Sequence, residues 1–300
     1  FTEALLKVGE EHPEVVAITA AMPDSTGLLP FQDRFPDRFF DVGIAEPHAF
    51  TAAAGMALGG LKPVVALYST FLTRAIDQAN LDVGLHGAPV VFCLDRAGIT
   101  GDDGPSHHGI LDMVLLSKVP GMTVFAPSSY QDLQVMLADA IDLDGPVAIR
   151  WPKTEARNVP EHEVGVGRRG RKLRDGSDVC ILAVGKMVAA ALDAATSLEA
   201  DGISTSVWDA RCVAPLDGEM LDDAAGHPAV LTAEDGLIDG GAGESMLRHL
   251  LDRDPGLSSR VKVLGVPKRY LPHGKVDDIL AELGLDADGL AYSARALITD

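Results

Sequence analysis

The sequence is poor in cysteine, aromatic residues and positive charge, and each shortage excludes a class of protein. Its 300 residues include three isolated cysteines, so neither a disulfide framework nor a zinc-ligand set can be drawn. Lys and Arg number 25 against 44 Asp and Glu, which gives a net charge of −19. Because a field of that sign repels nucleic acid and anionic lipid, we expect no nucleic-acid partner.

Long apolar runs are missing as well. No stretch reaches the length of a membrane span, and the N-terminus lacks the basic and apolar segments of a secretory signal. We therefore expect no membrane partner and a reducing, cytoplasmic location. The chain begins at Phe1 and not at Met, so we expect either that it has been trimmed or that it is a piece of a longer protein.

Three common catalytic and phosphate-binding motifs are also absent. The sequence contains no Gly-x-Gly-x-x-Gly, no Gly-x-x-x-x-Gly-Lys-Ser/Thr and no Gly-x-Ser-x-Gly. These absences argue against a dinucleotide fold, a P-loop and the usual hydrolase nucleophile elbow. The glycine run at 240–243 opens a predicted helix, either as a tight turn or as an anion cradle.

Short β-branched runs alternate with longer amphipathic stretches throughout, which is typical of mostly parallel sheets covered by helices. We expect an α/β fold of two doubly wound, mostly parallel-sheet domains at residues 1–155 and 176–300, joined by a linker at 156–175. In the first domain, strands are expected at 15–18, 39–42, 64–67, 90–94, 123–126 and 147–150, and helices at 2–11, 46–58, 70–85, 110–116 and 130–141. In the second, strands are expected at 179–184, 204–208, 229–233 and 261–265, and helices at 187–200, 218–225, 243–251 and from 275.

Ligands in such sheets gather at the carboxyl ends of strands, so the loops that follow strands are the ones to inspect. One of these loops places Glu46 at the start of a predicted helix. A carboxylate there is held on rigid backbone, although the helix dipole favours Glu in a first turn whatever its function. The next loop carries Phe71, Arg74 and Gln78 at helical spacing, either facing one ligand or serving as core and surface residues.

The third loop, residues 95–109, is long, glycine-rich and loaded with polar side chains. It contains Arg96, two adjacent Asp residues and two adjacent His residues directly after a buried strand. Loops of this length in compact domains are usually functional. Adjacent histidines do not readily close on one ion, and the spacing of a calcium loop is missing, so we expect no metal held by this chain.

Taken together, residues 41–49, 68–78 and 95–109 strongly resemble the 1-deoxy-D-xylulose-5-phosphate synthase family of transketolase-like thiamine diphosphate enzymes. The resemblance continues through residues 209–217, 234–243 and 270–274. It covers the family's second and third domains, a pyrimidine-binding domain and a transketolase C-terminal domain. It implies a transferase that condenses pyruvate with D-glyceraldehyde 3-phosphate, yielding 1-deoxy-D-xylulose 5-phosphate and carbon dioxide for isoprenoid precursors.

The resemblance also implies roles for individual residues. Glu46 would hydrogen-bond the aminopyrimidine ring of the cofactor and favour its imino tautomer, while Ile44, Phe71 and Arg74 would complete that pocket. His107 would stand near the reacting carbons as a hydrogen-bond donor or proton shuttle.

A second set of residues falls where the family binds the aldehyde substrate. Tyr68, Arg96 and Arg150 would bind this substrate and its phosphate, and Asp103 would orient Arg96 or Arg150. Guanidinium groups suit this task because their geometry matches that of phosphate.

Two departures from the family pattern matter. Pro47 stands where the family usually has Gln, which removes an amide near the cofactor but suits a first helical turn. The family's first domain, which binds Mg²⁺ and the diphosphate of thiamine diphosphate, has no counterpart in these residues. The metal and diphosphate ligands are therefore expected outside this chain, in a homodimer of a longer chain or in a heterotetramer with a diphosphate-binding subunit.

Other interpretations remain. A split transketolase or the β-subunit of a 2-oxoacid dehydrogenase would share Glu46 but use a different acceptor. A catalytically silent assembly partner is the third possibility. The joint presence of the residues named above weighs against a silent partner, whereas Pro47 weighs mildly for it.

Overall fold

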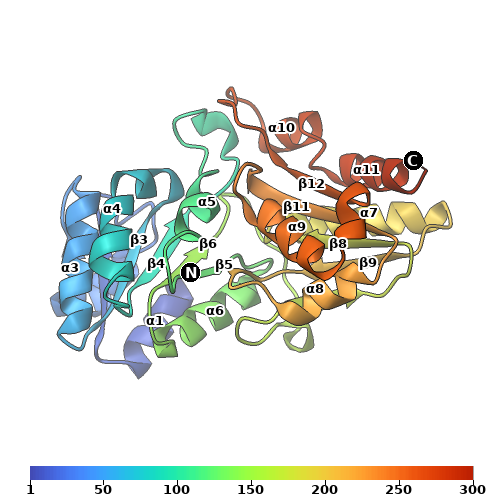
Figure 1. Ribbon diagram of the computed structural model, residues 1–300. Helices are drawn as coiled ribbons and strands as arrows, with labels where there is room; N and C mark the ends of the chain where they lie inside the picture. The colour runs from blue at the N-terminus through green and yellow to red at the C-terminus, as the bar shows by residue number, and fades with distance from the viewer. Residues whose placement is uncertain (300) are drawn as a thin grey trace.

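The chain folds into two units, and each unit is built on one sheet that helices cover on both faces (Figure 1). The structure is a computed structural model and describes residues 1–299. The first unit lies on the left of Figure 1 in blue and green, and the second lies on the right in orange and red. The expected α/β class with two mostly parallel, doubly wound sheets is confirmed. No helix in residues 1–299 has the length and apolarity needed to cross a bilayer.

The first sheet has seven strands in the order β10-β5-β6-β4-β3-β1-β2, and all of its pairings are parallel except that of β10 with β5. Its strands are β1 (Val15–Thr19), β2 (Phe39–Asp41), β3 (Lys62–Tyr68), β4 (Val91–Asp95), β5 (Thr123–Phe125), β6 (Val147–Arg150) and β10 (Cys212–Ala214). The chain runs from β1 outward to β2 and then returns to β3 on the other side of β1. The carboxyl ends of β1 and β3 therefore flank a topological switch point, where open α/β sheets bind their ligands.

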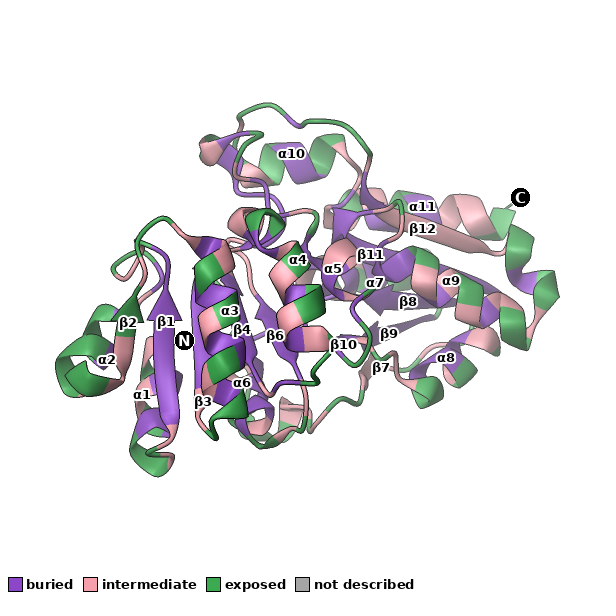
Figure 2. Cartoon of the chain, turned by 60° about the vertical axis from the view of Figure 1, so that its left-hand side comes forward, coloured by how far each residue is buried: buried purple, intermediate pink, exposed green. Residues whose placement is uncertain are grey.

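Helices pack on this sheet because apolar residues recur along one face of each. Apolar side chains of α1 and α6 meet one face of the strands, and those of α3 and the turns after β3 meet the other. The helices and helical turns of the first unit are α1 (Thr2–Glu11), α2 (Leu29–Arg34), η1 (Pro36–Arg38), α3 (Glu46–Leu58), η2 (Ser69–Arg74), α4 (Ile76–Gln78), η3 (Ala79–Gly84), η4 (Gly101–Asp103), α5 (Asp112–Leu116) and α6 (Tyr130–Asp142). Figure 2 shows the strands as mostly buried and the outer sides of the helices as exposed.

The second sheet has five strands in the order β12-β11-β8-β9-β7. Helices α7 and α11 cover one face, whereas α8 and α9 cover the face whose core continues into the first unit. The strands are β7 (Arg171–Arg174), β8 (Val179–Ala183), β9 (Thr205–Asp209), β11 (Ala229–Leu237) and β12 (Val261–Val266). The helices are η5 (Glu161–Glu163), α7 (Met187–Ala200), α8 (Gly218–Ala225), α9 (Ala242–Arg253), η6 (Pro255–Ser259), α10 (Val276–Glu282) and α11 (Ala287–Thr299).

Several predicted elements differ from those observed. The predicted helix at 70–85 is a 3-10 turn, one short α-turn and a π-helical turn in succession. The predicted helical tail from 275 is two helices, α10 and α11. Part of the predicted linker forms strand β7, which pairs antiparallel with β9 at the edge of the second sheet. Strand β10 was not predicted, and it joins the first sheet although its residues come from the second half of the chain.

Two buried ion networks tie the units together. Arg150, at the end of β6, is 2% exposed and donates to Asp112 at 3.0 Å and to Asp235 of β11. In the other network, Arg211 donates to Asp132 at the start of α6 over 3.2 Å. Since both networks link residues far apart in the sequence, they fix the relative position of the two sheets.

Candidate functional site

The predicted site residues lie at the carboxyl ends of β3 and β4 and at the start of α3, next to the switch point of the first sheet. Glu46 is the first residue of α3 and is only 3% exposed, although helix starts are commonly solvated. Among residues 1–299, Arg74 makes the only hydrogen bond and ion pair to its carboxylate, with 3.5 Å between Nη1 and Oε1. Arg74 itself is 56% exposed, so a buried carboxylate is approached by one cation from the solvent side.

An aromatic row extends from this pair. The guanidinium carbon of Arg74 lies 5.7 Å from the centre of the Phe71 ring. The Phe71 ring is nearly parallel to that of Tyr68, with 5.8 Å between their centres, and the imidazole of His107 meets it edge-on, also at 5.8 Å. The 3-10 turn η2 brings Phe71 and Arg74 together because residues three apart lie on one side of such a turn. The sequence predicted this contact on a regular helix, which is not what forms.

Arg96 closes the far end of the row. Its guanidinium carbon lies 4.0 Å from the centre of the Tyr68 ring, and its Nη1 donates to Asp95 at 3.0 Å. The backbone of Arg96 is left-handed, with φ of 58°, which is uncommon for a residue with a side chain. Burial raises the pKa of Asp95, an effect that the neighbouring Arg96 partly opposes.

Ile44 and Asp103, two further predicted site residues, lie in different surroundings. Ile44 is 78% exposed just before α3 and does not pack into the core. Asp103 was predicted to orient Arg96 or Arg150, but its partner is Lys153, with 2.9 Å between Nζ and Oδ2. The hydrogen bond from Lys153 lowers the pKa of Asp103.

The structure does not place Arg150 where a phosphate could reach it. Its side chain is 1% exposed and is already paired with Asp112 and Asp235. Burial opposes its charge, yet the two carboxylates more than compensate and raise its pKa. Lys153, three residues later and 38% exposed, is the cation that the loop after β6 presents beside Asp103. Sequence reasoning missed Lys153, although its position directly after a strand was a usable signal.

Residues of the second unit pack against the loop at 95–109, which carries Asp103 and His107. Nδ1 of buried His108 accepts from the amide of Thr100 at 3.1 Å, and its Nε2 lies 3.5 Å from the carbonyl of Pro272. Burial lowers the pKa of His108, which favours the neutral ring that this contact with Thr100 requires. A side chain at Gly104 would collide with the ring of His273. The loop is therefore clamped between the two units.

The glycine run at 240–243 is not an anion site. Buried Glu234 accepts hydrogen bonds from the amides of Ala242 and Gly243, at 3.2 and 2.7 Å. Burial raises the pKa of Glu234 to about 7 even though these amides oppose the shift. The chain's own carboxyl group thus fills the position that an external anion would need, and the tight-turn interpretation is the one that the structure supports.

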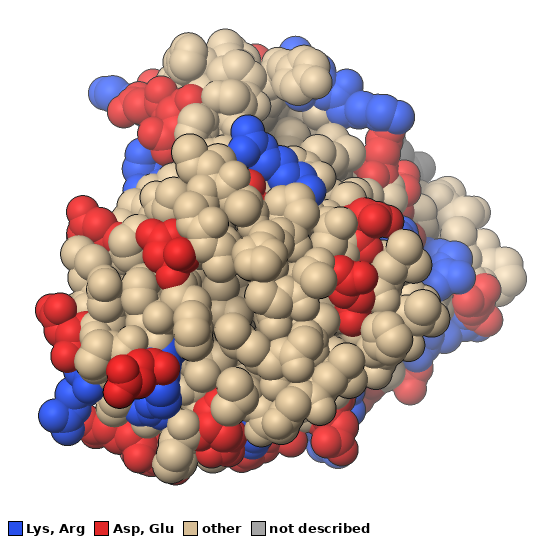
Figure 3. Space-filling view, turned by 90° about the vertical axis from the view of Figure 1, so that its left-hand side faces the viewer, with Lys and Arg blue, Asp and Glu red and all other residues tan. Residues whose placement is uncertain are grey.

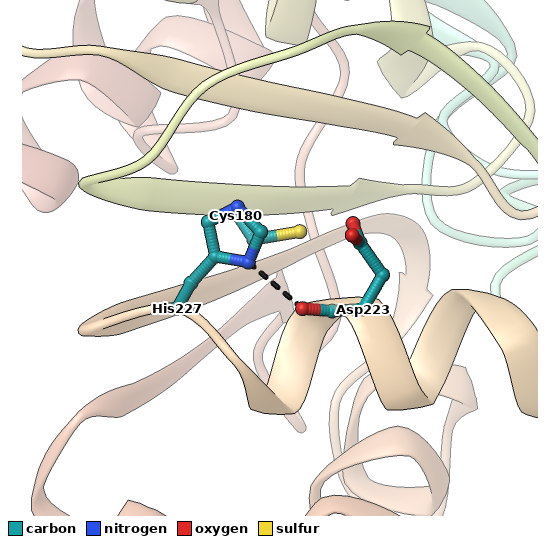
Figure 4. Close-up of side chains that lie close together, drawn as sticks. All are labelled: Cys180, Asp223 and His227. Carbon is teal, nitrogen blue, oxygen red and sulfur yellow. Dashed lines mark hydrogen bonds between the residues drawn. The ribbon is translucent and has the colours of Figure 1, made fainter.

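One group of side chains in residues 1–299 has metal-ligand spacing, namely Cys180, Asp223 and His227 (Figure 4). The carboxylate of Asp223 is already bonded to the indole of Trp208 at 2.7 Å and to the ammonium group of Lys172 at 3.1 Å. Both ring nitrogens of His227 face oxygen atoms, including the carbonyl of Asp223 at 2.9 Å. Burial strongly raises the pKa of the Cys180 thiol. We interpret this group as a buried structural contact, and none of the predicted site residues belongs to it.

Models of known protein families match both units of the chain. The family model described as "Transketolase, pyrimidine binding domain" matches residues 1–159, and that described as "Transketolase, C-terminal domain" matches residues 168–290. The chain belongs to the transketolase family. Within this family, it is 47% identical over 99% of its length to the 1-deoxy-D-xylulose-5-phosphate synthase of Magnetococcus marinus. It is also 47% identical over 97% of its length to the synthase of Mycobacteroides abscessus.

The transketolase-family chain spans about half the length of these curated relatives, 48% and 46% respectively. A solved structure described as "Split gene transketolase, inactive beta4 tetramer" superimposes with a TM-score of 0.86 at 30% identity, covering 99% of this chain and 96% of that one. The expected resemblance to the second and third domains of the synthase is therefore confirmed.

Proposed function

We propose that this chain supplies the pyrimidine-binding half of a thiamine diphosphate site in an enzyme that condenses pyruvate with D-glyceraldehyde 3-phosphate. The products would be 1-deoxy-D-xylulose 5-phosphate and carbon dioxide, as the resemblance to the synthases suggests. The observation that carries the proposal is the buried Glu46 carboxylate at the open end of an aromatic row. Mg²⁺ and the diphosphate group would be held by polypeptide outside these 300 residues.

The residues present fit the pyrimidine end of this cofactor. Phe71 offers an aromatic face for a flat heterocycle, and exposed Ile44 adds apolar surface before α3. The Glu46 carboxylate can hold a proton at a ring nitrogen, because burial excludes the water that would compete for it. When bound, thiamine diphosphate supplies the nucleophilic carbon and the electron sink for loss of carbon dioxide. Arg74 lies beside Glu46 and forms an ion pair with its carboxylate at 3.5 Å.

We assign the aldehyde substrate to the other end of the aromatic row, where Arg96 lies. Arg96 and Lys153 are the cations presented by neighbouring loops, and they suit the phosphate of the aldehyde. Asp103 would orient Lys153, and His107 would donate to oxygen atoms near the reacting carbons. We thus transfer to Lys153 the phosphate-binding role that the sequence assigned to Arg150.

A large uncharged face supports the need for a partner. Figure 3 shows the side of the molecule that carries α3 and α4, where Lys, Arg, Asp and Glu lie mainly around the margin. The exposed apolar side chains on and near these elements include Leu58, Leu81 and Leu85, which are 65%, 47% and 75% exposed. Exposed apolar side chains on a face with few charges are typical of protein contact surfaces. A second chain seated here would cover α3 and enclose the adjacent site.

The test is Glu46→Gln in the complete assembly, with Glu11→Gln on the exposed end of α1 as the matched control. We expect turnover of pyruvate and glyceraldehyde 3-phosphate to fall roughly 100- to 10,000-fold, because the variant cannot hold the ring proton. The thermal unfolding midpoint should stay close to that of the control. A Glu46→Gln enzyme with most of its turnover intact would contradict the assignment.

The likeness to the split-gene transketolase favours a second candidate, a transketolase assembled from two polypeptides. Both candidates use Glu46 in the same way. The expectation from the sequence was a different acceptor, but the substrate that separates the two candidates is the donor, pyruvate in one and a ketose phosphate in the other. Supplying pyruvate in one assay and a ketose phosphate in another, each with glyceraldehyde 3-phosphate, separates them.

A further inference from the structure

A cavity of about 310 Å³ lies between the two units, at a place that the proposed reaction does not use. Leu133 and Trp151 of the first unit and Met187 and Leu280 of the second form part of its apolar wall. Its volume is at the lower end of the range for small-molecule sites. It also adjoins the carboxyl end of β8, and β8 and β11 flank the switch point of the second sheet.

Two cations in this cavity have no protein partner. Lys186, just before α7, and Arg157 both line it. Neither side chain makes a hydrogen bond or an ion pair within residues 1–299, although acidic residues outnumber basic ones 44 to 25. Burial lowers the pKa of Lys186, an effect that Asp235 and Asp277 only partly oppose, so its charge is under-compensated by the protein.

One further donor without a partner lines the same cavity. The hydroxyl oxygen of Thr154, another lining residue, is buried and has no hydrogen-bond partner. Ala189 and Ala190 of the 14-residue helix α7 also line the cavity, whereas the amides of Met187 and Val188 at the start of this helix are already bonded to the carbonyls of Val184 and Gly185. A buried donor without an acceptor is costly, so this end of the cavity is suited to a carboxylate.

Negatively charged side chains line the same cavity. Four carboxylates, those of Glu155, Asp193, Asp277 and Asp286, line the cavity, and none of them makes an ion pair within the described residues. Lys186 and Asp277 share the cavity yet do not approach within the 4.0 Å of a salt bridge. A ligand with both a carboxylate and an ammonium group would satisfy both poles, and its apolar body would contact the wall.

We propose that this cavity binds a small apolar amino acid, with its carboxylate toward Lys186 and its ammonium group toward Asp277. Both units contribute to the cavity, so the ligand stabilises their docking. The site shares no residue with the pyrimidine-binding site and does not depend on the proposed reaction.

The experiment titrates three matched probes into the purified 300-residue chain and follows binding by ligand-detected NMR and by the thermal unfolding midpoint. L-leucine carries both charged groups, 4-methylpentanoate lacks the ammonium group, and 3-methylbutylamine lacks the carboxylate. We expect saturable leucine binding, 4-methylpentanoate binding several-fold weaker, and no binding of the amine. Lys186→Gln should weaken leucine binding at least tenfold, whereas the exposed control Lys268→Gln should not.

Absence of saturable leucine binding to the wild-type chain would overturn the proposal, as would a Lys186→Gln chain that binds leucine normally. Equal affinity for leucine and 4-methylpentanoate would overturn the role of Asp277. Should Lys186→Gln fail to fold, exposed Asp277→Asn provides the second variant, with a several-fold weaker affinity for leucine expected and an unchanged affinity for 4-methylpentanoate.

Discussion

Charged residues occur at the proposed pyrimidine-binding edge and at the boundary between the two units, and the two sets differ in how their charges are paired. At the edge, buried Glu46 has one partner, Arg74, which is more than half exposed. At the boundary, Arg150 is paired with two buried carboxylates and is 1% exposed. At the boundary, the charge of Arg150 is thus balanced within this chain, although its Nη2 and Oδ2 of Asp235 are buried without a hydrogen-bond partner. At the edge, the carboxylate of Glu46 has only the exposed Arg74 as its ion-pair partner. This difference distinguishes structural charges from functional ones more clearly than residue type does.

The largest expected effect is the loss of a boundary charge. Arg150→Ala leaves Asp112 and Asp235 buried without their cation, and such a change typically costs about 3–5 kcal/mol of unfolding free energy. Arg74→Ala, at the edge, should cost less than Arg150→Ala, because Arg74 is 56% exposed and contributes one contact at 3.5 Å to Glu46. Urea unfolding of the two variants provides the measurement. Similar losses for both would abolish the distinction.

The second expected effect is a pH dependence of stability that originates at the boundary. Burial, reinforced by the nearby charge of Asp132, raises the pKa of Asp209 to about 7. A raised carboxyl pKa means that the folded chain binds the proton more tightly than the unfolded chain. Its stabilising contribution is therefore full below about pH 4 and is lost as the pH rises toward 7, with a slope of up to about 1.4 kcal/mol per pH unit.

Asp209→Asn should remove its share of this slope because the amide does not titrate. Unfolding free energies measured from pH 4.5 to 7.5 check it, and Asp252→Asn on the surface of α9 serves as the control. Glu234, whose pKa is also about 7, should retain its own share in the variant. An Asp209→Asn chain with the wild-type slope would show that this carboxyl group is ionised throughout.

The smallest expected effect on stability is at the substrate end of the edge. Lys153→Ala breaks an exposed pair with Asp103 and should change the unfolding free energy by less than about 1 kcal/mol. In the complete assembly it should raise the KM for glyceraldehyde 3-phosphate about tenfold and leave that for pyruvate nearly unchanged, as expected for loss of one charged contact. Lys153→Arg, which keeps the charge, should restore most of the affinity. Equal effects on both substrates would argue against a phosphate contact.

The sequence predicted the elements with strong periodicity and the loops between them. Helix α3 begins and ends where predicted, because its apolar residues are continuous and Gly59 follows its last residue. The predicted helix at 70–85 was wrong in type, since local pattern does not distinguish an α-helix from the 3-10 and π turns that the packing here selects. Three-residue β10 gives too short a pattern to be recognised, and its partner is about 90 residues away in the sequence.

Predictions for the site were limited in a similar way. The family resemblance placed Glu46, Phe71 and Arg74 in one pocket, and the strands that precede them end at the same edge of the sheet. It could not distinguish Arg150 from Lys153, because burial depends on carboxylates that come from elsewhere in the chain. Asp235 lies 85 residues beyond Arg150, and no local pattern connects the two.

Strand β10 has a practical consequence for dissecting the molecule. A gene fragment truncated between the two family matches would yield a first unit in which β5 loses its outer neighbour. The newly bared main-chain amides and carbonyls would then invite pairing with other chains. The boundary between the two family matches is therefore not a suitable place to cut the chain. Expression trials should retain residues 212–214 with the N-terminal portion.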